Sequence, residues 1–235
     1  HRALAALRDG GIRELSLDAL ERRTTTEPDR RSTRGGWFGY VAGVAWAMLG
    51  AGHALGGADL AIAGEVPPGA GLSSSAALEL ATARALAAAT GTPWDPVRMA
   101  KLGQKAENKY VGMNCGIMDQ FASAACEAGH ALLLDCRSLE TRPVPVPSGA
   151  AVVVMDTGAR RSLAGSAYND RRAACERVVA EIAKTAPGVR ALRDVTVDQL
   201  AAAKPRLDAA DFKRASHVVP ENKRPVETAE ALQAG

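Results

Sequence analysis

A glycine-rich turn followed by three consecutive serines constrains this chain more than any other feature. The turn lies in residues 67–79, with the sequence PPGAGLSSSAALE. Gly69 and Gly71 allow backbone angles that other residues rarely adopt, and they let the main chain approach a ligand closely. The serines at 73–75 fall where a helix offers unpaired N–H groups and the positive end of its dipole. The segment therefore predicts a phosphate-binding loop, with an ordinary capped helix after a proline-rich turn as the alternative.

The residues after the turn have helical periodicity. Small or apolar residues recur at steps of three and four, at Leu72, Ala76, Leu80, Ala83 and Ala87. The chain then reaches Gly91 and Pro93, which end a helix. No lysine lies in the turn, so the segment is not a Walker P-loop, and the dinucleotide-binding fingerprint is also missing. Any phosphate site here is of another kind.

The composition is that of a soluble globular protein, because the 235 residues are 47% hydrophobic and 23% charged. The formal net charge is only +3, from 29 basic and 26 acidic residues, which argues against a nucleic acid or a membrane surface as a partner. Cys115, Cys126, Cys136 and Cys175 lack metal-binding spacing and predict reduced, mostly buried thiols of a cytoplasmic protein. Residues 40–58 are nearly uncharged, but they are rich in glycine and alanine and predict a buried helix rather than a membrane span.

Periodicity and turn residues predict the remaining elements. Helices are expected at about residues 37–49, 95–112, 117–127 and 167–183, and strands at about 58–66, 131–135, 142–146 and 151–156. Asp95 suits a helix cap with Pro96 in the first turn, whereas the prolines in 142–146 limit that strand to a sheet edge. The change of pattern near Gly149 predicts two domains, residues 1–148 and 149–235.

Two motifs resemble a known family. Residues 67–76 resemble the second motif of the GHMP small-molecule kinases, a loop that wraps nucleotide phosphates, with Ser73 where many members carry glycine. Residues 106–123, with the run CGIMDQF at 115–121, resemble the galactokinases within that family. The galactokinase resemblance extends from about Trp37 to the end of the chain, through the segments 134–140, 156–158, 162–172 and 214–219. It implies an α+β, two-domain GHMP kinase fold, incomplete at both ends.

The resemblance also implies a reaction, in which ATP with Mg²⁺ phosphorylates the C1 hydroxyl of galactose. Asp119 matches the catalytic residue, which takes the proton of that hydroxyl or orients its oxygen. The positions that match galactose contacts are Gly116, Asp119 and Tyr168. The positions that match the metal-facing pair are Ser74 and Glu107. The positions that match ATP contacts are Pro68, Gly69, Ala70, Gly71, Leu72, Ser73, Ser74 and Ser75, with Trp37 and Tyr40 near the adenine. Taken singly, each of these residues also has a structural explanation, as a cap, a solvated side chain or a core residue.

Two family motifs have no counterpart in this sequence: the amino-terminal motif that supplies an arginine beside the catalytic aspartate, and the glycine-rich third motif. Losing such a charged group commonly costs about a hundredfold to a thousandfold in rate, so we expect the polypeptide as written to be a weak or inactive kinase. Pro220 and Pro225 fall where a continuous helix is expected, and either would interrupt it. Two alternatives are a kinase for a related sugar such as N-acetylgalactosamine, and a non-catalytic galactose and ATP sensor. We expect a monomer.

Overall fold

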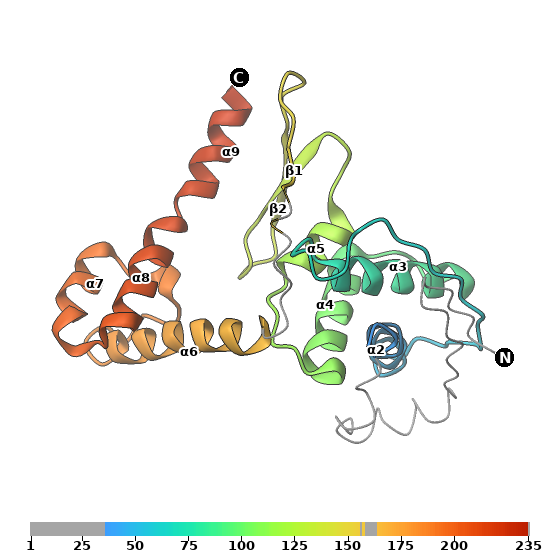
Figure 1. The fold of residues 1–235 in the computed structure, drawn as a ribbon, viewed down its shortest axis with the longest axis horizontal. Coiled ribbons are helices and arrows are strands. Elements are labelled where there is room, and N and C mark those ends of the chain that lie inside the picture. The colour runs from blue at the N-terminus through green and yellow to red at the C-terminus, as the bar shows by residue number, and fades with distance from the viewer. Residues whose placement is uncertain (1–35, 156, 158–163, 235) are drawn as a thin grey trace. The chain divides into compact units, whose positions relative to one another are not determined.

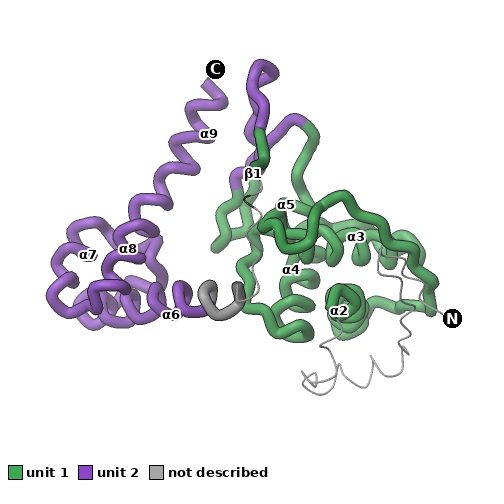
Figure 2. The backbone as a smooth tube through the Cα atoms, in the orientation of Figure 1, with its two compact units in different colours: residues 1–128, 134–141, 153–161 green, residues 129–133, 142–152, 162–235 purple. Residues whose placement is uncertain are grey.

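The computed structural model describes residues 36–155, 157 and 164–234, without the side chains of residues 164–168. The chain divides into two compact units (Figure 2). Unit 1 holds His1–Ala128, Leu134–Thr141 and Val153–Arg161, and unit 2 holds Gly129–Leu133, Arg142–Val152 and Ser162–Gly235. The predicted boundary at residue 149 stays a prediction.

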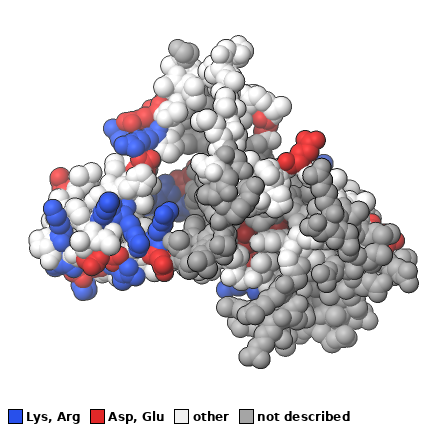
Figure 3. All heavy atoms as spheres, in the orientation of Figure 1, with Lys and Arg blue, Asp and Glu red and all other residues white. Residues whose placement is uncertain are grey.

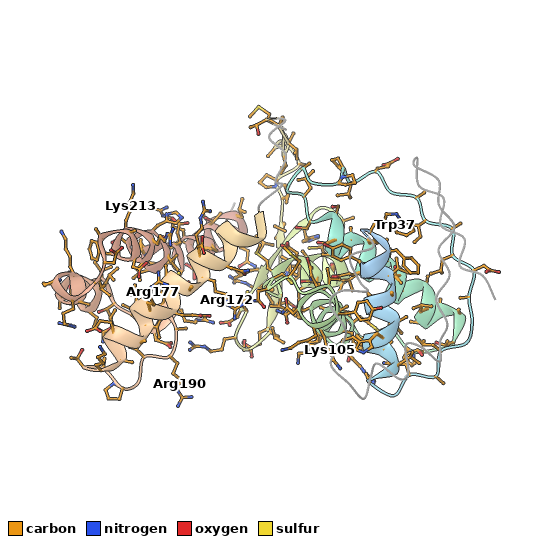
Figure 4. All side chains as sticks on the ribbon, turned by 60° about the horizontal axis from the view of Figure 1, so that its bottom comes forward. Trp37, Lys105, Arg172, Arg177, Arg190 and Lys213 are labelled. Atoms are coloured by element: carbon orange, nitrogen blue, oxygen red, sulfur yellow. The ribbon has the colours of Figure 1, made fainter. Side chains whose placement is uncertain are left out.

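The described part of unit 1 contains four α-helices that pack against one another (Figure 1). They are α2 (Phe38–Leu49), α3 (Ser74–Ala89), α4 (Pro96–Lys105) and α5 (Met118–Ala125). Their shared core contains Val44, Ala47, Met48, Leu80, Ala83, Met99 and Leu102. Lys105, at the end of α4, lies over the ring of Trp46 in α2, with its Nζ 5.0 Å from the ring centre (Figure 4). The predicted helices at residues 37–49 and 117–127 are confirmed within two residues at each end.

Helix α4 begins as the sequence predicts but ends differently. The Asp95 Oδ1 atom accepts a hydrogen bond from the Arg98 N–H at 3.1 Å, and Pro96 occupies the first turn. After Lys105 the helix widens into a π-helix, Ala106–Val111, which ends at Gly112 with φ +89°. The N–H of Gly112 donates to the Glu107 carbonyl at 2.9 Å, the five-residue spacing that defines a π turn. Single π turns inside helices are frequent at functional sites.

The described sheet is a hairpin of two strands, β1 (His130–Leu134) and β2 (Thr141–Pro145). Both strands are edges, which agrees with the prediction for the proline-containing strand. In β2 the buried Val144 alternates with two exposed prolines. The hairpin confirms two of the four predicted strands.

The other two predicted strands are wrong for the described residues. Residues 58–66 and 151–155 are not assigned to any strand, although their side-chain pattern favours one. A strand needs a hydrogen-bonded neighbour, and the described residues place none beside these segments. The side chains of Val152, Val153, Val154 and Met155 are 61% to 85% exposed. Strand propensity alone therefore did not decide their structure.

Unit 2 is helical outside the hairpin. It contains α6 (Ala164–Ala183), α7 (Val197–Ala203), α8 (Ala209–Glu221) and α9 (Arg224–Ala234), with short 3₁₀ turns at Leu192–Asp194 and Lys204–Arg206. Its core gathers Val178, Ile182, Leu192, Leu200, Ala215 and Val219. Helix α6 begins three residues before the prediction and ends where it was expected. Residues 222–223 separate α8 from α9, between Pro220 and Pro225, so the predicted interruption is confirmed.

An ion pair joins α6 to α8. The guanidinium of Arg177 donates two hydrogen bonds of 2.7 Å each to the carboxylate of Asp211, which is buried (Figure 4). The Arg177 hydrogen bonds lower the pKa of Asp211. On the face drawn in Figure 3, basic and acidic side chains are interspersed over this helical part. Both signs of charge are present among the described side chains of this part.

Two predictions from composition have different outcomes. Residues 40–58 contain the buried helix α2, and no described helix has the length and apolar character needed to cross a membrane. The four cysteines form no disulfide, but the prediction that most of them are buried is wrong. Cys126 and Cys136 are exposed, and Cys115 and Cys175 are half-buried.

Candidate active site

The glycine-serine loop adopts left-handed backbone conformations at alternate residues. Gly69 has φ +74°, Gly71 has φ +80° and Ser73 has φ +58°. Glycine adopts such angles freely, but in serine they are uncommon and cost free energy. Ser73 precedes α3 without a capping hydrogen bond from its side chain. An ordinary serine cap therefore does not explain this loop.

Four polar side chains, most of them buried, are joined by hydrogen bonds, and we call Glu79, Glu107, Cys115 and Gln120 the carboxyl cluster. Glu79 and Gln120 are fully buried, and Glu107 is 7% exposed. The Gln120 Nε2 atom donates to Glu107 Oε2 at 2.8 Å and to Glu79 Oε2 at 3.1 Å. It also lies 3.6 Å from the Cys115 Sγ atom. The cluster therefore joins α3, the π-helix and α5, which are the three elements that carry the predicted phosphate, metal and catalytic residues.

Burial governs the charge of this cluster. Desolvation, followed by the nearby charge of Glu107, raises the pKa of Glu79 to about 9. Desolvation likewise raises the pKa of Glu107, while hydrogen bonds from Cys115, Ser75 and Gln120 oppose the rise. Burial and the two carboxylates raise the pKa of Cys115 to about 12. At neutral pH, Glu79 is a neutral acid and Cys115 is a thiol rather than a thiolate.

Two other predicted site residues, Ser75 and Asp119, act on the carboxylate of Glu107. The side chain of Ser75 hydrogen-bonds to the Glu107 carboxylate, and the charge of Asp119 acts on it from α5. Asp119 is half-buried and lies in the first turn of α5, one residue before the inward-facing Gln120. Serine 74, the predicted metal partner of Glu107, is half-buried at the first residue of α3. The hydrogen bond to Glu107 thus comes from the next residue along, Ser75.

The predicted adenine contacts lie at the start of α2. Trp37 stands at the N-cap position of this helix without a side-chain capping hydrogen bond (Figure 4). Its ring packs edge-on against that of Phe38, with centroids 5.9 Å apart. Burial and the charges of Glu107 and Glu79 raise the pKa of Tyr40 to about 12. Tyr40 therefore lies within electrostatic reach of the carboxyl cluster. Its predicted contact with adenine stays a prediction, as does that of Trp37.

Asn108 holds the loop that carries the predicted sugar contact Gly116. Its Oδ1 atom accepts a hydrogen bond from the Cys115 N–H at 2.8 Å, and its Nδ2 atom donates to the Cys115 carbonyl at 3.4 Å. Gln104 also donates to that carbonyl at 3.4 Å. The loop between the π-helix and α5 is therefore fixed to the helix before it. The predicted contact Tyr168 lies in α6 of unit 2, and its side chain is outside the described residues.

Sequence reasoning missed Glu79, Gln120 and Asn108 as parts of this site. A signal for the first two was present. Glu79 stands three residues after Ala76 and four before Ala83, so it occupies the buried face of α3. Gln120 lies beside Phe121 on the buried face of α5. A charged or amide side chain at a core position usually belongs to a hydrogen-bonded network.

Comparisons with known proteins agree with this arrangement. Residues 39–127 match the family of GHMP kinases, N terminal domain. A galactokinase of Roseiflexus sp. (strain RS-1) is 50% identical over 205 residues, which are 87% of this chain and 52% of that protein. The crystal structure of Lactococcus lactis galactokinase complexed with galactose matches 100% of this chain and 59% of its own, with a TM-score of 0.83 and 31% identity.

Fold and site together define a small-molecule kinase architecture, and the chain belongs to the GHMP kinase family. Within that family, both of these relatives are galactokinases. The predicted α+β GHMP fold is confirmed. The chain spans about half the length of the curated relative and 59% of the solved structure.

Proposed function

We propose that this chain provides the phosphate-binding and catalytic part of a galactokinase, which transfers the γ-phosphoryl group of ATP to the C1 hydroxyl of galactose. The observation that supports this most strongly is the interaction of Ser75 and Asp119 with the carboxylate of Glu107, together with a loop that holds three left-handed residues. Phosphoryl transfer asks a protein mainly to position the reactants and to stabilise charge on the phosphate oxygens. A loop at a helix N-terminus and an acidic pair opposite it supply both requirements.

The residues present fit a magnesium ion. Mg²⁺ prefers hard oxygen ligands and takes few of them from protein. Glu107 and the hydroxyls of the loop are such ligands. Burial and the charge of Asp119 raise the pKa of Glu107, and a nearby divalent cation would favour its ionised form. Glu107 and Ser74 would hold the ion, which neutralises charge on the phosphates when it is bound.

The remaining roles belong to the chain's own residues. Asp119, in the first turn of α5, would accept the proton of the sugar hydroxyl or orient its oxygen. The loop from Pro68 to Ser75 would hold the phosphates, with Trp37 and Tyr40 toward the adenine. Gly116, in the loop fixed by Asn108, would contact galactose together with Asp119. Tyr168 is proposed for the same sugar from its match to the family alone.

Calorimetric titration of the 235-residue polypeptide tests the proposal. We expect it to bind ADP more tightly with Mg²⁺ than without, and to bind galactose in preference to N-acetylgalactosamine. A preference for the acetylated sugar would favour the related-sugar kinase instead. Galactose-dependent ADP release, measured at enzyme concentrations high enough to detect slow turnover, separates an enzyme from a sensor. Binding of both ligands with no release, even after the two missing family motifs are added to the chain, would favour the sensor.

The proposal also covers the location of the protein, its domain boundary and its oligomeric state. Cysteines that form no disulfide fit a cytoplasmic protein. The change of sequence pattern fits a domain boundary near residue 149. We expect the protein to be a monomer. Size-exclusion chromatography with light scattering measures the oligomeric state. A stable dimer at micromolar concentration would contradict the monomer.

A further inference from the structure

We propose that Gln120, held by Glu79, is a positioning residue that fixes the carboxylate of Glu107 toward the metal ion. This inference rests on the proposed function, because it assigns to Glu107 the metal that the function requires. Neither Gln120 nor Glu79 would touch the metal or the substrates. Their task is to set the direction of a carboxylate that does.

The first argument is the hydrogen bonding of a single nitrogen. A glutamine amide carries two N–H donors. Here the Gln120 Nε2 atom lies 2.8 Å from Glu107 Oε2 and 3.1 Å from Glu79 Oε2. Each carboxyl can therefore receive one of the two hydrogens. One N–H of Gln120 points at Glu79, and this orients the amide so that its other N–H points at Glu107.

The second argument is the tight packing around this amide. Gln120 and Glu79 are both 0% exposed. Gly103 of α4 lies against them, because a Cβ atom built there would stand 3.1 Å from Gln120 Cγ and 3.5 Å from Glu79 Oε2. A side chain with so little space has few rotamers available. The amide is therefore held by sterics as well as by hydrogen bonds.

The third argument is the place of the three residues in the fold. Glu79 lies one turn after the serines in α3, Glu107 lies in the π-helix, and Gln120 follows Asp119 in α5. The bridge through Gln120 thus ties the phosphate loop, the metal carboxylate and the catalytic aspartate to one another. Partners that orient metal ligands in this way typically contribute 10-fold to 100-fold to metal affinity.

The experiment measures the binding of Mn²⁺, as a probe for Mg²⁺, to the full 235-residue chain in the presence of ADP by water-proton relaxation. Gln120→Met should weaken Mn²⁺ binding about 10-fold to 100-fold. The affinity of the Gln120→Met variant for ADP without metal should stay within about twofold of the wild-type value. A general loosening of the fold would weaken both kinds of binding. Gln233→Met is the control, since Gln233 is an exposed glutamine of α9 whose Oε1 atom accepts a hydrogen bond from Arg142 rather than bonding to the carboxyl cluster. It should leave Mn²⁺ affinity unchanged.

If Gln120→Met does not fold, a pair of variants at Glu79 tests the positioning role of Gln120 instead. Glu79→Met removes the acceptor that holds the amide and should weaken Mn²⁺ binding about tenfold, whereas Glu79→Gln keeps an oxygen there and should restore it. Equal Mn²⁺ affinity in Gln120→Met and wild type, or in the two Glu79 variants, would overturn the positioning role. Failure of the wild-type chain itself to bind Mn²⁺ with ADP would instead overturn the proposed function.

Discussion

Replacing Glu79 by glutamine should change how the stability of this protein depends on pH. In the folded protein, burial raises the pKa of Glu79 to about 9, whereas in the unfolded chain its pKa is close to the ordinary value of 4.5. Between these two values the folded state binds the proton and the unfolded state does not. The free energy of unfolding therefore falls as the pH rises through this window. Glutamine has the shape of the protonated acid and does not titrate. The free energy of unfolding of the variant therefore does not fall for this reason as the pH rises.

The size of the effect follows from the pKa difference. One pKa unit corresponds to about 1.4 kcal/mol, so three pH units, from about pH 5 to about pH 8, give an upper bound of about 4 kcal/mol. Water entering the core on ionisation reduces this figure, and we expect a gain of about 1–3 kcal/mol for Glu79→Gln over wild type at about pH 8. At about pH 5 the two proteins should agree within about 0.5 kcal/mol, because wild-type Glu79 is then protonated in the folded state.

Urea unfolding followed by circular dichroism at three pH values between these limits provides the measurement. Glu127→Gln, at an exposed position, controls for the change in net charge and should run parallel to wild type. If the stability curves of Glu79→Gln and wild type were also parallel across the range, Glu79 would have to be ionised in the folded protein. The argument from burial would then be wrong.

Three further changes test the packing, the loop and the second unit. Gly103→Ala places a Cβ 3.1 Å from Gln120 Cγ, and this overpacking, about 1–3 kcal/mol, should outweigh the helix-propensity gain of about 1 kcal/mol, so that the urea midpoint falls. Ser73→Gly removes the cost of a left-handed serine, about 1–2 kcal/mol, but the glycine makes the unfolded chain more flexible, which costs the folded state about 0.5–1 kcal/mol. The urea midpoint should therefore stay the same or rise slightly. A clear fall would show that the serine side chain stabilises the loop. Asp211→Asn should lower the melting temperature more at neutral pH than at about pH 3, because Arg177 lowers the pKa of Asp211. The stability that this carboxylate contributes above the ordinary value of 3.8 decreases as the pH falls toward the lower folded value. Equal destabilisation at both pH values would assign the effect to packing instead.

The helices of unit 1 could be predicted because their signals are local. Asp95 and Pro96 define a helix start by their own chemistry, and the apolar face of α3 repeats within a few turns. The strands could not be predicted equally well. Residues 152–155 have a typical strand composition, yet pairing depends on a neighbour far away in the sequence, which periodicity does not reveal.

The candidate site also has a part that the sequence predicts and a part that it does not. The motif in residues 106–123 predicted Glu107 and Asp119 as site residues, because the resemblance lies in the order of residues along the chain. The partnership of Glu79 with Gln120 spans 41 residues and exists only once α3 and α5 pack together. The π turn was also missed, since one extra residue in a helix leaves no clear trace in apolar spacing.

Glu107 is tied to the protein at two places, and this limits how the position can vary. Its carbonyl accepts hydrogen bonds from the N–H groups of both Gly112 and Met113 at 2.9 Å, while its carboxylate receives Gln120 at 2.8 Å. The backbone therefore cannot shift to compensate for a shorter side chain. An aspartate at this position would keep the charge but withdraw it by one methylene group, away from the amide and from any ion it holds. For this residue, the length of the side chain matters as much as its charge.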